Sequence, residues 1–90
     1  VDYTVEKFII TNEPVMESAM KVLEVLNKIN KITIKGKDES CPATVSVANI
    51  ITQNLLNGTT KTEKISLNNE FLDDGRMIST IEIIIRKISN

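Results

Sequence analysis

Apolar and polar residues alternate most regularly over residues 78–87, near the end of the chain. On a strand this alternation places Ile81, Ile83 and Ile85 on one face and mainly polar side chains on the other. The segment has no Gly or Pro, and its β-branched residues favour a pleated, half-buried surface. Because an edge strand with such an apolar row would invite aggregation, the pattern predicts a central strand.

Helical spacing of apolar residues predicts two helices. The first is expected over residues 14–28, because Pro suits the first helical position. The second is expected over residues 42–57, with Gly58 ending it. In the first helix, the apolar residues that recur at helical spacing are Val15, Ala19, Val22, Leu23 and Leu26.

The remaining apolar runs predict three more strands, at residues 3–10, 32–35 and 60–67. In the last of these, alternation places Glu63, Ile65 and Leu67 on one face. A polar connection over residues 68–76 contains Asp74-Gly75, a hairpin signal, and leads into the final strand. The order βαβαββ predicts a two-layer α/β sandwich, formed by one domain that spans residues 1–90.

The second helix lies in a stretch without charge. Residues 40–60 contain no charged side chain in a chain that is 26% charged, and their apolar positions spread over roughly 240° of a helix. A helix that packs on a sheet and exposes its other side to water needs a narrower apolar face than this. We therefore predict that another subunit covers part of the second helix. The alternative is cover by the first helix and loops of the same chain. The expected interface residues are Val47, Ile50, Ile51 and Leu55.

Eleven basic and twelve acidic side chains give a net charge of -1, which disfavours unspecific attraction to nucleic acid or anionic lipid, although a local basic patch remains compatible with it. One Cys excludes an internal disulfide, and the lack of His argues against a zinc site. No signal peptide and no apolar run long enough for a bilayer are visible. Without a Gly-rich phosphate loop or a nucleophile spaced with a base, we expect no enzyme, cofactor, small-molecule substrate or membrane partner.

Five segments in order match one known family: Pro14-Val15-Met16, Leu26-Asn27, Ile32-Thr33-Ile34-Lys35, Asp74-Gly75-Arg76 and the final strand at 78–87. In this combination, which covers essentially the whole chain, the sequence resembles the Alba family of archaeal chromatin and RNA-binding proteins, which also has eukaryotic relatives. The resemblance implies a mixed four-stranded sheet in the order 1-2-4-3, with the last strand interior and two helices on one face. It also implies a homodimer or heterodimer whose extended β-hairpin arms flank a nucleic-acid surface, in a cytoplasmic protein associated with the nucleoid or with RNA.

The chain departs from the family pattern where phosphate contacts are expected. Thr11-Asn12-Glu13-Pro14 stands in place of a Gly-Lys-Lys-Pro loop, and Lys37-Asp38-Glu39 in place of an Arg-Gly-Arg loop. The alternative roles of the remaining candidates are solvated surface lysines, a turn arginine and a helix cap at Asn12. The candidate nucleic-acid-binding residues are Lys35, Lys37, Lys64, Arg76 and Asn12.

The resemblance therefore implies a non-enzymatic protein that binds DNA or RNA through the backbone with little sequence specificity. Because phosphate contacts supply most sequence-independent affinity, a chain with few of them is expected to bind weakly and to be displaced easily by salt. The alternative is an Alba-like dimerisation module that has lost direct binding and pairs with a basic paralogue. Binding by the isolated protein at low salt distinguishes the two.

Overall fold

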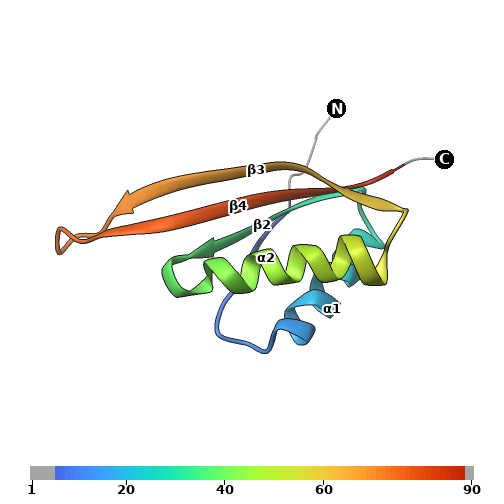
Figure 1. The fold of residues 1–90 in the computed structure, drawn as a ribbon, viewed down its shortest axis with the longest axis horizontal. Helices are drawn as coiled ribbons and strands as arrows, with labels where there is room; N and C mark the ends of the chain where they lie inside the picture. The colour runs from blue at the N-terminus through green and yellow to red at the C-terminus, as the bar shows by residue number, and fades with distance from the viewer. Residues whose placement is uncertain (1–5, 89–90) are drawn as a thin grey trace.

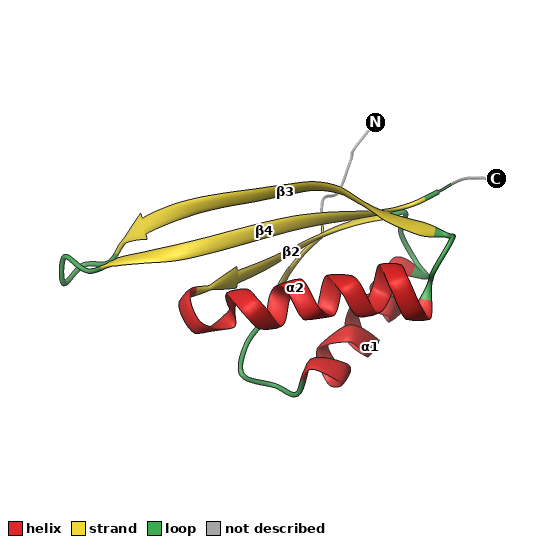
Figure 2. Ribbon diagram, in the orientation of Figure 1, coloured by secondary structure: helices red, strands yellow, loops and turns green. Residues whose placement is uncertain are grey.

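The chain folds into a four-stranded sheet with helices on one side (Figures 1 and 2). A computed structural model describes residues 6–88. Helix α2 continues without a break into a π-helical segment, η2, and a short 3₁₀ turn, η1, precedes it. The elements are β1 (Glu6–Ile9), α1 (Val15–Leu26), β2 (Lys31–Lys37), η1 (Asp38–Ser40), α2 (Cys41–Asn49), η2 (Ile50–Leu55), β3 (Thr60–Phe71) and β4 (Met77–Lys87).

The sheet has the strand order β1-β2-β4-β3. Strand β1 is parallel to β2, whereas β4 is antiparallel to both of its neighbours, β2 and β3. The βαβαββ fold, the order 1-2-4-3 and the interior position of the last strand are therefore confirmed. Of the first predicted strand, residues 3–5 lie outside the described residues.

The core lies between the sheet and the two helices. The predicted row Ile81, Ile83 and Ile85 is at most 5% exposed, and Ile83 and Ile85 pair across the ladder with residues of β2. Full burial of one such side chain contributes about 1.5–3 kcal/mol. The other large side chains that are completely buried in this core are Val22, Leu26, Ile32, Ile34, Val47 and Ile51.

Helix α2 begins very close to β2 at Gly36. A Cβ atom at this glycine would lie 1.9 Å from the Thr44 Oγ1 atom and 2.8 Å from the Ser40 carbonyl oxygen. Thr44 is fully buried, and its hydroxyl donates a 2.7 Å hydrogen bond to the same carbonyl. The missing side chain of Gly36 therefore permits the approach that seats α2 on the sheet.

The second helix differs from its prediction in its last part. Residues 50–55 adopt π-helical geometry, in which the N–H of Leu56 donates to the carbonyl of Ile51 over 2.8 Å. The sequence predicts a helix to residue 57, but hydrophobic periodicity alone does not distinguish an α-helix from a π-helix. Gly58, with φ +83°, lies in the turn that follows the helix.

Strand β3 contains a β-bulge between Thr62 and Lys64. A bulge inserts one residue into a strand and so changes which side chains share a face. Thr62 pairs with buried Ile85, while the Glu63 carboxylate binds cations on the other side of the sheet. The predicted grouping of Glu63 with Ile65 and Leu67 is therefore wrong, because regular alternation does not reveal an inserted residue.

Strands β3 and β4 extend as an arm beyond the rest of the sheet (Figure 1). The pairing of β2 with β4 ends at Lys37 and Thr80, but β3 and β4 remain paired as far as Phe71 and Met77. Residues 68–71 of the connection expected at residues 68–76 are thus strand, and the hairpin turn is confined to residues 72–76. Gly75 takes φ +89° in this turn, as the hairpin signal predicted.

Candidate nucleic-acid interface

The sheet has one uncovered face, opposite the helices, which we call the open face. Because Ile83 and Ile85 point into the core, their neighbours Glu82 and Arg86 point to the open face, and cross-strand partners share that direction. Seven basic and three acidic side chains lie there and leave a net charge of +4. They are Lys7, Lys31, Lys35, Lys37, Lys61, Lys64 and Arg86, and Glu63, Glu70 and Glu82.

Each glutamate of the open face lies between two cations. Glu63 contacts Lys31 at 2.8 Å and Arg86 at 3.1 Å. Glu70 contacts Lys37 at 3.4 Å and Lys35 at 3.5 Å. Glu82 contacts Lys7 at 3.6 Å and Lys35 at 3.8 Å. Three carboxylates thus engage five cations, so this network itself keeps a positive charge.

The ion pairs affect the acidity of two of these glutamates. A hydrogen bond from Lys31 is the main cause that lowers the pKa of Glu63. Desolvation alone would raise the pKa of Glu70, but Lys37 and Lys35 together outweigh it and the pKa is lowered. The Arg86 Nε atom is buried and, although close to Glu63, is not aligned for a hydrogen bond, so this contact is an ion pair only. Both glutamates are therefore anionic at neutral pH.

Three of the predicted binding residues lie on the open face. The side chain of Lys35 is only 19% exposed, and two carboxylates hold it. Lys37 is exposed and shares Glu70 with Lys35. Lys64 is exposed and, among residues 6–88, has no ion pair. The structure thus brings these three lysines to one surface, where they differ in how many carboxylate partners compete with a ligand for them.

The other two predicted residues lie elsewhere. Arg76 is at the tip of the arm, about 13 Å along the strand direction from the last residue that pairs with β2. Its Nε atom lies 2.8 Å from Asp74, whose pKa is lowered mainly by the Arg76 backbone N–H. Asn12 is exposed in the loop before α1, where Pro14 holds the N-cap position without a side-chain hydrogen bond. The five predicted residues therefore do not form one cluster.

The edge of the sheet from which the arm projects is acidic. Because β1 and β2 are parallel, the loops that follow them meet at this edge. One loop carries Glu13, which binds Lys21 over 2.6 Å, and the other carries exposed Asp38 and Glu39. Carboxylates at this edge oppose the approach of phosphate groups.

Comparison with known proteins identifies the family. The family model for Alba matches residues 6–69. The chain belongs to the Alba family. Members of this family generally bind nucleic acids and are typically not enzymes.

Solved structures agree with this assignment. The structure is similar to Alba from Thermoplasma volcanium, with a TM-score of 0.82, 28% sequence identity, and coverage of 90% of this chain and 99% of that chain. It shares its fold with ALBA1 from Trypanosoma brucei, with a TM-score of 0.78, 12% identity, and coverage of 98% of this chain and 74% of that chain. Comparison with curated protein sequences gives no match. None of the helices within residues 6–88 has the length and apolarity that crossing a membrane requires.

Sequence reasoning missed several cations that this Alba-family chain places on the open face. Lys7, Lys31 and Arg86 join the ion-pair network, and Lys61 pairs with Arg86 across the ladder. Strand alternation could have found Lys31 and Arg86. Arg86 follows Ile85, the last residue of the buried row on β4, and Lys31 on β2 pairs with Arg86. The side of Lys61 relative to Lys64 depends on the bulge and so required the structure.

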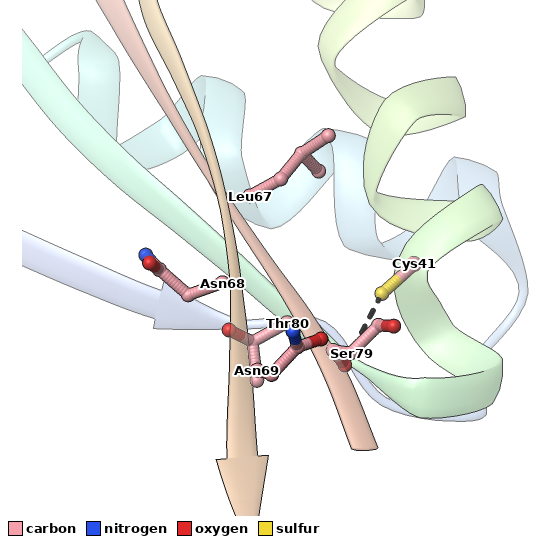
Figure 3. A pocket seen from close by; sticks show the side chains of 6 residues that line it. All are labelled: Cys41, Leu67, Asn68, Asn69, Ser79 and Thr80. Atoms are coloured by element: carbon pink, nitrogen blue, oxygen red, sulfur yellow. Dashed lines mark hydrogen bonds between the residues drawn. The ribbon is translucent and has the colours of Figure 1, made fainter. Parts of the chain in front are cut away.

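The helix side of the Alba-family arm is apolar and uncovered. Ile65, Leu67, Phe71 and Met77 are each more than half exposed, because α2 packs mainly on β2 and β4 and only its continuation η2 packs appreciably on β3. At the base of the arm, a hollow of about 230 Å³ is lined partly by Leu67 and Cys41 (Figure 3). The Cys41 thiol donates a 3.7 Å hydrogen bond to the Ser79 carbonyl oxygen, which ties the start of α2 to the arm.

Proposed function

We propose that this Alba-family chain binds DNA or RNA through the phosphate backbone, without base readout, and acts as a dimer. The observation that carries the proposal is the net charge of +4 on the open face of a chain whose overall charge is -1. Family membership supports the same class of ligand. Lysines recognise phosphate as point charges and carry no sequence information, so the binding is unspecific.

The affinity is low, so that moderate salt is enough to release the nucleic acid. Of the predicted contacts, Lys35 and Lys37 must exchange Glu70 for phosphate, and Arg76 must exchange Asp74. Replacing a carboxylate partner by a phosphate adds little net free energy to the binding of nucleic acid. Since the salt slope is about -0.9 per phosphate contact for duplex DNA, a chain with few available cations has a shallow slope and a weak low-salt affinity.

The dimer surface that we propose combines η2, the last part of the second helix, with the arm. Val47 and Ile51, two of the predicted interface residues, are buried in the chain's own core and offer a partner no exposed surface. Leu55 is 39% exposed, and Ile50 is half-buried. We therefore retain these two residues and add the apolar helix side of the arm, where a second copy or a related chain would cover the exposed side chains.

A binding titration tests this function. The purified protein is titrated against duplex DNA and against single- and double-stranded RNA at ~20 and ~150 mM salt, and its mass in solution is measured alongside. We expect a dimer that binds at low salt and is largely released at the higher concentration. The double substitution Lys35→Glu with Lys37→Glu should weaken low-salt binding at least tenfold. A well-folded dimer that binds none of these nucleic acids at ~20 mM salt would rule out the proposed function.

A second candidate function is an interaction module that pairs with a basic paralogue. The observation that favours it is the acidic edge, where Glu13 lies in the loop after β1 and exposed Asp38 and Glu39 follow β2. In this role the chain contributes its apolar dimer surface, and the partner contributes the cations. A heterodimer that binds nucleic acid when neither the isolated chain nor its homodimer does so would support this role.

A further inference from the structure

The charges of this chain are separated between its two layers. The open face carries a net charge of +4. Around the helices, the described charges sum to -3, from Glu13, Glu17, Glu24, Asp38 and Glu39 against Lys21 and Lys28. The overall charge of -1 therefore conceals one basic and one acidic side.

We propose that the open face itself, and not the acidic edge or the arm tip, receives the phosphate backbone of a nucleic-acid duplex, and that Glu63, Glu70 and Glu82 limit its affinity. This inference rests on the proposed function and names its surface. Charge substitutions on the open face and on the helix layer should affect binding differently, because phosphate is attracted to the open face and repelled by the helix layer.

The geometry of the open face fits a phosphate backbone. Its cations stand on all four strands, from Lys7 on β1 to Lys61 and Lys64 on β3. They therefore form an extended basic plane that no single loop provides. Among residues 6–88, the open face presents no aromatic side chain on which an unpaired base could stack, which favours a duplex, with its phosphates outside, over a single strand.

The three glutamates occupy positions that phosphates would take. Each one bridges two cations, at distances between 2.8 and 3.8 Å. A phosphodiester also carries one negative charge and accepts hydrogen bonds from neighbouring cations. Binding must therefore displace or oppose these carboxylates, whereas Lys61 and Lys64, without ion pairs in the described chain, bind phosphate with no carboxylate to displace.

The first test reverses charge on the open face. Lys61→Glu with Lys64→Glu leaves every observed ion pair in place, so the fold should persist. The control, Lys21→Glu with Lys28→Glu, changes the net charge equally on the helix layer, with the loss of one exposed ion pair between Lys21 and Glu13. In a titration against a fluorescent 20-base-pair DNA at ~20 mM salt, we expect at least a tenfold weaker affinity for the first variant and less than a twofold change for the control. Each phosphate that the first variant no longer binds should make its salt slope shallower by about 0.9.

The second test removes a carboxylate charge without changing its shape. Glu70→Gln frees Lys37 and leaves Lys35 paired with Glu82 alone among the described residues, so we expect it to tighten DNA binding about threefold. Glu24→Gln, which makes the same change of charge on the exposed side of α1, should leave affinity unchanged. Because this test uses a different variant and predicts a gain of affinity, it holds even if the charge-reversal variant fails to fold.

The outcomes separate this inference from the function on which it rests. If neither the wild-type protein nor Glu70→Gln binds DNA or RNA, the proposed function fails. If the protein binds but Lys61→Glu with Lys64→Glu has no effect while Arg76→Glu abolishes binding, the function stands and the open face is wrong. Equal binding to vesicles of phosphatidylserine, with the same sensitivity to these substitutions, would also overturn the assignment to a nucleic acid.

Discussion

At the scale of single residues, Gly36 decides how closely α2 approaches the sheet. The space that a side chain needs is taken by Thr44 and by the Ser40 carbonyl, both of which belong to the start of that helix. Thr44 is buried and hydrogen-bonded, so it cannot swing away without leaving a polar group unpaired. The glycine is thus required for packing and not for an unusual backbone angle.

We expect Gly36→Ala to destabilise the fold by about 1–3 kcal/mol, because overpacking displaces α2. Urea unfolding measures this free energy. In a background that carries Thr44→Ala, the added methyl group meets fewer atoms, so the same substitution should cost at least ~0.5 kcal/mol less. Strictly additive effects of the two substitutions would contradict the close approach of Thr44 to Gly36.

At the scale of elements, the arm is a hairpin without a core of its own. Its side chains beyond residue 66 are mostly exposed, and backbone pairing together with the turn at residues 72–76 holds it. Gly75 has φ +89°, a conformation that costs an L-residue with a bulky side chain about 1–2 kcal/mol. The arm should therefore unfold locally, at lower free energy than the body.

We predict that Gly75→Val increases hydrogen exchange of the backbone amides in residues 66–71 and 77–80. The urea midpoint of the body should stay within error of the wild type, because no core residue is affected. Asp73→Ala, in the same turn and without an observed ion pair among the described residues, serves as the control. An equal fall of the body's midpoint would show that the arm and the body unfold together.

At the scale of the whole molecule, the two faces of strand β3 have different chemistry. Its open face carries Lys61 and Lys64, whereas its helix side exposes Ile65, Leu67 and Phe71. Exposed apolar side chains grouped in this way mark a surface for another protein. One strand can therefore contribute to nucleic-acid binding with one face and to assembly with the other.

We expect Leu67→Asp with Phe71→Asp to convert the proposed dimer into monomers, because a charge on the apolar face would be buried between the subunits. Analytical ultracentrifugation gives the mass of each variant. Ser66→Asp with Asn68→Asp adds the same charge to the opposite face of the same strand and should leave a dimer. If both variants remain dimers, the subunits associate through another part of the molecule.

The order of the secondary-structure elements, the central position of β4 and the buried row of Ile81, Ile83 and Ile85 could all be predicted from the amino-acid sequence. These properties follow from local periodicity and from the need to bury a continuous apolar row, which residues 78–87 express without ambiguity. The hairpin turn at Asp74-Gly75 was predictable for the same reason, since its backbone angles depend on the residues of the turn itself.

Which charged side chains lie together could not be predicted without the folded structure. The cations of the open face come from four strands, and their carboxylate partners lie far away in sequence. For example, Lys7 near the start of the chain pairs with Glu82 near its end. The bulge at Glu63 and the burial of Val47 and Ile51 likewise depend on how strands pair and how α2 seats against Gly36. Charge composition sums over the whole chain, whereas binding depends on one face, and that face exists only once the strands are paired.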